Sequence, residues 1–214
     1  MKFLIKSFIF LFISFVVLLI GLYTYAYLSP KLDLKTSGSL YLYDNKNDLV
    51  YQGSRSNEWA NLEDISDNLK NAVIAVEDKN FYNHHGFDYL RIAKAMLTNI
   101  KKKSIVQGAS TISQQYIKNL YLDFDKTWKR KAEEAMLTLE LEVHYDKDDI
   151  LEGYLNTINY GQGNMGIVNA SSYYFNKKPS ELTLEEAIML AGLPKNPVAE
   201  SVDINENGEI LGIF

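Results

Sequence analysis

Two acidic residues lie at the C-terminal end of a predicted helix with an apolar face. A carboxylate at such a place can take part in acid–base chemistry. Glu77 and Asp78 follow directly on apolar residues that recur at helical spacing: Leu69, Ala72, Val73 and Val76. A negative charge at this end of a helix meets the negative end of the helix dipole, and apolar neighbours disfavour the charged form of a carboxylate. A carboxylate turned inward there is therefore a better proton acceptor near neutral pH. The alternative is that both are solvated surface charges, because most acidic residues are exposed.

A second polar cluster lies downstream and opens another helical pattern. Ser110 and Thr111 stand at its start, where the free backbone amides of a helix can receive an anion. Gly108, just before them, allows close approach of another backbone. The polar residues that follow recur at helical spacing and form one stripe: Gln114, Gln115, Lys118 and Asn119. Such a stripe with one cation fits a substrate that combines sugar and phosphate, although Ser110 and Thr111 could also be simple helix caps.

An uncharged apolar run from residue 7 to residue 30 precedes both clusters. It is longer than the roughly 20 residues that cross a bilayer core as a helix and than the roughly 7–15 apolar residues of a signal peptide. It ends in residues typical of a membrane interface: Tyr23, Tyr25 and Tyr27. We therefore predict a retained membrane anchor. Because Lys2 and Lys6 lie on the short N-terminal side, the N-terminus is predicted in the cytoplasm and residues 31–214 outside.

The other elements are predicted from caps and periodicity. Two short apolar runs flank the turn-rich segment Asp44 to Asn47 and predict a small β-hairpin. Helices are predicted to begin at Ser66, Asp88, Thr111, Asp149 and Thr183, and an amphipathic pattern predicts one more from Thr127 to Val143. Gly192 and Pro194 mark the end of the last helix. The sequence thus predicts a mostly α-helical domain with a minor β element.

Composition excludes several classes of function. The chain of 214 residues has a net charge of −5, so a general nucleic-acid-binding surface is not expected. Because it has no cysteine, it can form neither a disulfide framework, nor a thiol nucleophile, nor a cysteine-based zinc site. Its three histidines leave little room for a histidine-rich metal cage.

Five polar motifs follow one another along the chain. The first two are E-D-x-x-F-x-x-H-x-G from Glu77 and G-A-S-T-I-S-Q-Q-Y-I-K-N from Gly108. The other three are R-K-A-E-E from Arg130, I-L-E-G-Y-L-N from Ile150, and the stretch from Gly166 to Lys177. In this order they resemble the peptidoglycan glycosyltransferase (transglycosylase) domain of family 51, found in monofunctional transglycosylases and in the N-terminal half of class A penicillin-binding proteins. Ala109 departs from the pattern, because a second glycine is usual there.

The resemblance implies a lysozyme-like, mostly α-helical glycosyltransferase domain on the outer face of the cytoplasmic membrane, preceded by one transmembrane helix. The implied segments are the anchor (1–30), a linker with a small β element (31–65) and the glycosyltransferase domain (66–214). Such a domain polymerises lipid II into glycan strands. The 4-hydroxyl of an acceptor N-acetylglucosamine attacks the anomeric carbon of the donor with inversion, and undecaprenyl diphosphate leaves. The implied partners are lipid II, the growing strand, the membrane and other proteins of cell-wall synthesis.

By matching position, the resemblance implies a role for each polar residue. Glu77 is the expected general base, and Glu134 is a second carboxylate that orients the acceptor or a divalent ion, Mg²⁺ or Mn²⁺, at the diphosphate. The cations expected at the diphosphate are Lys118, Lys126 and Arg130. The other residues expected at the substrate are Asp78, Phe81, His84, Ser110, Thr111, Gln114, Gln115 and Asn119. For His84 the favoured alternative is a hydrogen bond that positions Glu77.

Three functions remain open from the sequence. The first is an active membrane-bound glycosyltransferase. The second is a truncated, non-catalytic anchored module that binds lipid II or a partner protein. The third is a lysozyme-like glycan hydrolase. Its substrate lacks a diphosphate, so Lys118 and Arg130 would have no phosphate to bind. Because the stretch from Val198 to Phe214 departs from the family pattern, we expect a foreshortened C-terminus and no transpeptidase domain on this chain.

Overall fold

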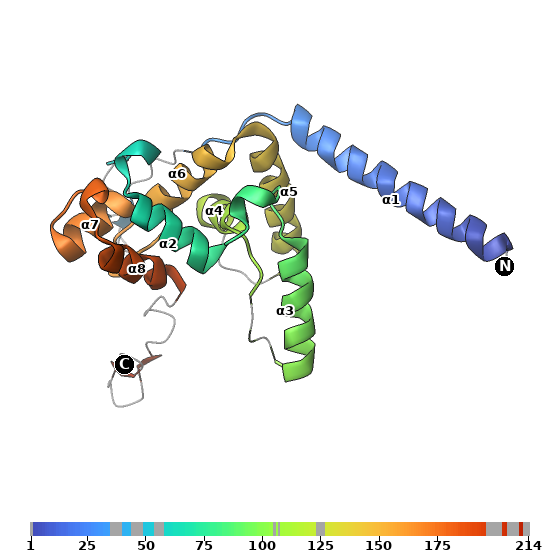
Figure 1. Ribbon diagram of the computed structural model, residues 1–214. Helices are drawn as coiled ribbons and strands as arrows, with labels where there is room; N and C mark the ends of the chain where they lie inside the picture. The colour runs from blue at the N-terminus through green and yellow to red at the C-terminus, as the bar shows by residue number, and fades with distance from the viewer. Residues whose placement is uncertain are drawn as a thin grey trace.

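The computed structural model describes residues 2–34, 40–43, 49–53, 58–104, 106, 108–122, 127–195, 203–204 and 210–211. In this part of the chain there are eight α-helices and two small antiparallel sheets, which confirms the predicted mostly α-helical fold with a minor β element (Figure 1). The helices are α1 (Lys2–Leu28), α2 (Asp67–Glu77), α3 (Tyr89–Lys102), α4 (Ile112–Tyr121), α5 (Trp128–His144), α6 (Lys147–Thr157), α7 (Ile167–Phe175) and α8 (Leu184–Gly192).

The strands are short, and each pairs with its neighbour in sequence. β1 (Leu40–Tyr43) pairs with β2 (Leu49–Gly53), and β3 (Asp203–Ile204) pairs with β4 (Ile210–Leu211). The first pair confirms the two strands of the predicted hairpin, whose turn from Asp44 to Asn47 lies outside the described residues. Single turns of 3₁₀-helix complete the fold: η1 (Leu62–Asp64), η2 (Phe81–Asn83), η3 (Pro179–Glu181) and η4 (Leu193–Lys195).

Most helices begin at the predicted caps. The side chains of Ser66, Asp88, Thr111, Thr127 and Thr183 each accept a hydrogen bond from a backbone amide of the first turn. The predicted start of a helix at Asp149 is wrong. Asp146 accepts hydrogen bonds from the amides of Asp148 and Asp149, at 3.1 and 3.0 Å, and starts α6 about one turn earlier. Asp148 and Asp149 then lie in the first turn, where the helix dipole favours negative charge.

α7 begins at a glycine rather than at a polar cap, so the capping patterns do not predict it. Gly166 precedes it with φ +79° and ψ 156°, a conformation almost restricted to glycine. A Cβ atom on Gly166 would lie 2.5 Å from the carbonyl oxygen of Asn156. The chain can therefore turn from α6 into α7 only with a glycine at this position.

The core lies around α4. This helix packs against both α5 and α6, while α2 packs along α8. The largest fully buried side chains come from α2, α4, α5 and α6 or from the segments that follow α2 and α6: Leu69, Phe81, Ile112, Tyr116, Ile117, Leu141, Ile150, Leu151, Tyr154, Leu155, Ile158 and Tyr160. α4 thus stands between the helix that ends at Glu77 and the helix that carries Glu134.

α1 extends away from the helical domain as a separate rod (Figure 1). It is long and apolar enough to cross a membrane, with a mean hydropathy of 2.8 and none of that stretch buried by the domain. Its last turn docks on the domain, where Ala26 is wholly buried and its carbonyl oxygen lies 2.9 Å from Nε2 of His144.

Three tyrosines bind the segment that leaves α1. The hydroxyls of Tyr145, Tyr121 and Tyr116 donate to the carbonyl oxygens of Leu32, Asp33 and Leu34, respectively. The three hydrogen bonds reach consecutive residues, and the tyrosines lie on α4 and directly after α5. The connection between α1 and the domain is therefore an integral part of the packed structure.

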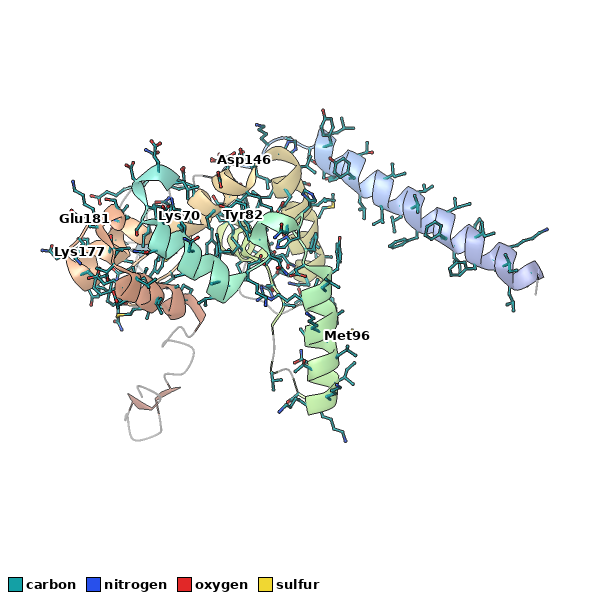
Figure 2. All side chains as sticks on the ribbon, viewed as in Figure 1. Lys70, Tyr82, Met96, Asp146, Lys177 and Glu181 are labelled. Carbon is teal, nitrogen blue, oxygen red and sulfur yellow. The ribbon has the colours of Figure 1, made fainter. Side chains whose placement is uncertain are left out.

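α3 projects from the domain (Figure 1), and Figure 2 labels one of its exposed apolar side chains, Met96. Its exposed large apolar side chains are Tyr89, Leu90, Ile92, Met96, Leu97 and Ile100, and its one buried residue is Ala95. Lys101 and Lys102 lie in its last turn. An amphipathic helix of this kind suits a membrane surface.

Candidate active site

Two buried carboxylates are held by neighbouring residues of α4. Glu77, the last residue of α2, is 4% exposed, and its Oε2 accepts a hydrogen bond of 2.8 Å from Nε2 of Gln115. Glu134, on α5, is 2% exposed, and its Oε1 accepts one of 3.2 Å from Nε2 of Gln114. Consecutive side chains on a helix point about 100° apart, so the two amides reach carboxylates on different helices.

Each of these amides is turned so that its nitrogen faces the carboxylate. Oε1 of Gln114 accepts a hydrogen bond from the backbone amide of Thr111 at 3.2 Å, within the capping box of α4. Oε1 of Gln115 accepts one from the hydroxyl of Tyr154, also at 3.2 Å. Burial, reinforced by the nearby charge of Glu77, raises the pKa of the Tyr154 phenol well above its ordinary value. The hydroxyl therefore stays a donor, and both amide orientations follow from the surrounding network.

Asp78 organises the segment next to Glu77. Its side chain is completely buried, and its Oδ2 lies 2.9 Å from Nε2 of His84 and accepts a hydrogen bond of 3.1 Å from the amide of Ile112. Ile112 is the first residue of α4, so the carboxylate caps a helix from elsewhere in the chain. The contacts of Asp78 and His84 position α4 against Glu77 from inside the protein.

Arg91 takes part in this arrangement, although the sequence motifs do not include it. One of its guanidinium nitrogens, Nη1, donates to the backbone carbonyl of Glu77 and lies 3.7 Å from Oδ1 of Asp78. A cation at the end of a helix satisfies carbonyl groups that have no partner within the helix. The available signal is weak: Arg91 comes directly after the apolar start of a helix capped by Asp88.

Asp88 in turn holds α3 beside this site. Its carboxylate accepts hydrogen bonds from the amide of Arg91 at 2.9 Å and from the side chain of Asn80 at 2.8 Å. These two donors lower the pKa of the Asp88 carboxyl below its ordinary value. The cap thus keeps its charge under mildly acidic conditions, and Arg91 stays in place.

Several motif residues have only structural contacts. Phe81 lies in the core with no exposed surface, and Nζ of Lys147 lies 4.5 Å from the centre of its ring. Thr111 is also wholly buried, and its hydroxyl donates to the carbonyl of Gly86 at 2.7 Å. Neither Phe81 nor Thr111 has exposed surface in this structure.

The two motif glycines differ in what they require. Gly86 has φ +80°, and a Cβ atom there would lie 3.0 Å from Cγ2 of Thr138. Gly108 was expected to allow close approach of another backbone, but a Cβ atom there would meet nothing within 4 Å. Of the glycines in the first two motifs, therefore, Gly86 has a geometric need for glycine and Gly108 has none among the described residues.

The fourth motif ties α6 to the start of the domain. Glu152 accepts hydrogen bonds from the indole of Trp59 at 2.7 Å and from the amide of Leu62 at 2.8 Å. Asn156 exchanges two hydrogen bonds of 2.9 Å with the backbone of Ala60. These contacts are architectural, whereas Tyr154, between them in sequence, reaches Gln115 in the site.

The expected cations lie around the same helices. Lys118 and Asn119 are exposed on α4, and Arg130 is half-buried in the first turn of α5. Nζ of Lys131 pairs with Oε1 of Glu134, an ion pair that motif matching had not assigned. Ser110 is half-buried before α4, and Lys126 lies outside the described residues.

The donor set does not form a complete metal cage. Among the described residues there is no group of three histidine, aspartate or glutamate side chains that could hold an ion. Glu134 is one carboxylate, and Lys131 already pairs with it. Mg²⁺ is often held by one or two carboxylates together with substrate phosphates.

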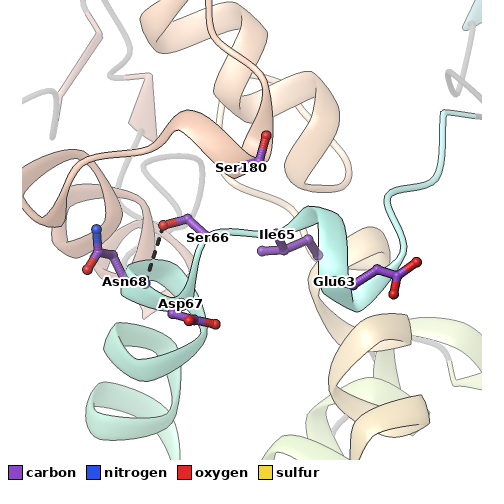
Figure 3. A pocket seen from close by; sticks show the side chains of 6 residues that line it. All are labelled: Glu63, Ile65, Ser66, Asp67, Asn68 and Ser180. Carbon is purple, nitrogen blue, oxygen red and sulfur yellow. Dashed lines mark hydrogen bonds between the residues drawn. The ribbon is translucent and has the colours of Figure 1, made fainter.

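A polar pocket of about 350 Å³ lies at the opposite end of α2 from Glu77 (Figure 3). It is lined by Glu63, Ile65, Ser66, Asp67, Asn68 and Ser180. α2 runs from Asp67 to Glu77, so the pocket is separated from Glu77 by the length of the helix, about 15 Å. It is distinct from the site around α4.

Comparison with known proteins gives matches over most of the chain. Residues 46–209 match the family described as Transglycosylase. Penicillin-binding protein 2D of Bacillus subtilis (strain 168) is 49% identical over 178 residues, which cover 83% of this chain and 26% of that protein. Penicillin-binding protein 1A of Neisseria lactamica is 45% identical over 176 residues, which cover 82% of this chain and 21% of that protein. The chain thus corresponds to about a quarter of the length of these relatives.

Proposed function

The chain belongs to the transglycosylase family, and from this premise we propose that it is a peptidoglycan glycosyltransferase that polymerises lipid II. The family itself implies a glycan or lipid-linked glycan substrate. In the proposed reaction the 4-hydroxyl of the acceptor sugar attacks the anomeric carbon of the donor with inversion. The bond from that carbon to the diphosphate oxygen breaks, and undecaprenyl diphosphate leaves with the electron pair.

Glu77 is the proposed general base. The observation that carries this proposal is its buried carboxylate, whose Oε2 is held by Gln115 at 2.8 Å while Tyr154 orients that amide. A carboxylate held in one orientation can accept the proton of the attacking hydroxyl without first reorganising. One base suffices for an inverting displacement, because the leaving group is already an anion and needs no proton.

Glu134 is proposed to orient the acceptor or an ion at the diphosphate. Gln114 and Lys131 both contact its Oε1, which supports a fixed orientation of the carboxylate. Glu134 is the residue that would hold Mg²⁺ or Mn²⁺, and the ion would supply positive charge to the leaving group. An assay arm with the chelator EDTA, followed by added Mg²⁺ or Mn²⁺, tests this requirement.

Lys118 and Arg130 are proposed to bind the diphosphate of the donor. We expect Lys118→Ala and Arg130→Ala each to lower kcat/KM for polymerisation by more than about tenfold, because a charge-assisted contact is worth about 1.5–3 kcal/mol. The matched control is Lys178→Ala, an exposed lysine beside η3 and away from the site. If both variants keep the wild-type kcat/KM, the diphosphate of the donor does not bind at Lys118 and Arg130.

Retention of α1 as a membrane anchor is also proposed, with the domain on the extracytoplasmic face. The three hydrogen bonds from Tyr145, Tyr121 and Tyr116 to residues 32–34 support it, because they join the end of α1 to α4 and α5. The exposed apolar stripe of α3 supports contact of the domain with the same membrane. The intact mass of the protein isolated from membranes reports whether α1 is retained.

Incubation of the full chain with purified lipid II tests the function directly. Glycan polymer together with released undecaprenyl diphosphate is the expected result. Cleavage of preformed glycan instead would indicate a hydrolase. Binding of lipid II without either reaction would indicate a non-catalytic anchored module, and both of these outcomes contradict the proposal.

A further inference from the structure

The apolar face of α3 is exposed over the length of the helix. Its large apolar side chains fall on one side at helical spacing and are all exposed: Tyr89, Leu90, Ile92, Met96, Leu97 and Ile100. Ala95 is the one residue of α3 that is buried. Because so little of the helix is packed, the domain alone does little to fix its orientation, and a segment with few buried contacts opens easily.

Positive charge borders this apolar face. Exposed lysines lie along α3 and at its C-terminal end: Lys94, Lys101, Lys102 and Lys103. The chain has no acidic residue between Tyr89 and Leu122, although its overall net charge is −5. An apolar face bordered by lysines matches a bilayer that contains anionic lipids. The apolar side chains enter the acyl boundary, and the ammonium groups stay at the phosphates.

The start of α3 lies beside the end of α1 that joins the domain. Tyr23 of α1 and Tyr89 of α3 line one apolar cavity, which α5 also borders. Both helices extend from the part of the domain that holds α5 (Figure 1). Tyrosines are typical of the membrane interface, and α1 is proposed to cross the membrane. The surface of that membrane is therefore the partner that fits the face of α3.

The first turn of α3 is joined to the segment that carries Glu77. Arg91 donates through Nη1 to the backbone carbonyl of Glu77, and the same nitrogen lies 3.7 Å from Oδ1 of Asp78. Asp88, which caps α3, accepts hydrogen bonds from the amide of Arg91 at 2.9 Å and from the side chain of Asn80 at 2.8 Å. A change in the orientation of α3 would therefore move the donor that holds the end of α2.

We propose that α3 docks on an anionic bilayer and that this docking keeps Arg91 against the carbonyl of Glu77. The proposal rests on the proposed function for the role of Glu77 as base, and it adds regulation of the site by the membrane surface. Arg91 is then a positioning residue, because it acts through Glu77. Without an anionic surface, α3 is held mainly by its first turn, and the segment after α2 opens more often.

The full chain in lipid nanodiscs tests the docking. The discs contain phosphatidylcholine alone or together with phosphatidylglycerol, and α1 anchors the chain in both. Because the chain has no cysteine, Met96→Cys provides a single site for a nitroxide label. In the anionic discs, we expect the label to be more accessible to oxygen and less accessible to a water-soluble nickel complex than in the neutral discs. Equal accessibility in the two kinds of disc would overturn the proposal.

Ser172→Cys, an exposed position on α7, is the matched control for the label. It should stay accessible to the nickel complex in both kinds of disc, because α7 is not part of the proposed docking surface. Shielding of both labels in the anionic discs would show that the lipid acts on the whole domain, and this would contradict docking through α3.

Hydrogen exchange and turnover test the connection to Glu77. The amides of Asp78 and Phe81, which bond within the backbone around the end of α2, should exchange about tenfold more slowly in the anionic discs. We expect kcat for lipid II to be higher there by a similar factor. Leu97→Glu places a charge in the apolar face and should remove both differences. Ile188→Glu, at an exposed apolar position on α8, is the matched control and should keep them.

Arg91→Gln separates docking from its effect on the site. The label at Met96→Cys should still dock in this variant, but neither exchange nor kcat should differ between the discs. If Arg91 had a merely structural role, kcat would fall alike in both discs and its ratio would persist, which would overturn the proposal. If Arg91→Gln does not fold, as judged by thermal unfolding, Asn80→Ala replaces it with the same expected outcomes. Because docking and exchange need no turnover, failure of polymerisation by the wild-type chain would contradict the proposed function alone.

Discussion

Glu77→Gln is expected to lower kcat for polymerisation of lipid II by at least about a hundredfold, with little change in KM. A positioned general base contributes about 10²–10⁴-fold to a reaction rate, and an amide cannot accept the proton of the acceptor hydroxyl. The substitution keeps the size of the side chain. The carbonyl oxygen of the new amide can still accept the hydrogen bond from Gln115, so the site should keep its shape. Initial rates of glycan formation give both constants.

Asp67→Asn is the matched control for this substitution. Asp67 lies at the other end of α2, where its side chain is 87% exposed and pairs with Lys70. Such an exposed pair contributes little, so kcat should stay near the wild-type value. If Glu77→Gln folds normally and keeps more than about a tenth of the wild-type kcat, Glu77 is not the base.

Gly153→Ala should destabilise the domain by about 2 kcal/mol or more, because it overfills the contact between α6 and α4. A Cβ atom on Gly153 would lie 2.0 Å from the hydroxyl oxygen of Tyr116 and 2.4 Å from Cζ of its ring. Tyr116 cannot move aside easily, since it is fully buried and its hydroxyl donates to Leu34 at 2.9 Å. For a domain of this size the melting temperature should fall by about 4–8 °C.

Gly192→Ala provides the matched control on another helix. Gly192 ends α8, and a Cβ atom there would meet nothing within 4 Å. The same chemical change should therefore leave the melting temperature unchanged or raise it slightly, because alanine favours the helix. Thermal unfolding in detergent compares the two variants. If Gly153→Ala and Gly192→Ala have equal melting temperatures, the side chain of Tyr116 can move aside for the added methyl group, contrary to the prediction.

The candidate site was partly predictable because each motif has a local pattern. Glu77 ends an apolar stripe, and the capping box of Thr111 and Gln114 opens α4 as its spacing predicts. The start of α6 was predicted wrongly, because Asp146 and Asp149 are both suitable caps and local spacing cannot choose between them. α7 was not predicted, because Gly166 starts it through backbone conformation alone.

The roles of Arg91 and Lys131 could not be predicted from local patterns. Arg91 reaches the carbonyl of Glu77 from a different helix, and Lys131 pairs with Glu134 on its own helix. An exposed basic run at the start of a helix has the same spacing whether or not it faces a buried carboxylate. Only the packing of the helices around α4 distinguishes these cases.

The sequence by itself determined the helical class, most helix starts and the apolar span of α1. These features depend on residues within a turn or two of each other, where periodicity and capping act. The tertiary structure decided which carboxylate each glutamine of α4 holds, and that Tyr154 orients Gln115. It also decided that α1 leaves an apolar cavity beside α5. These contacts join residues far apart in the chain, so their geometry exists only once α4 is packed among its neighbours.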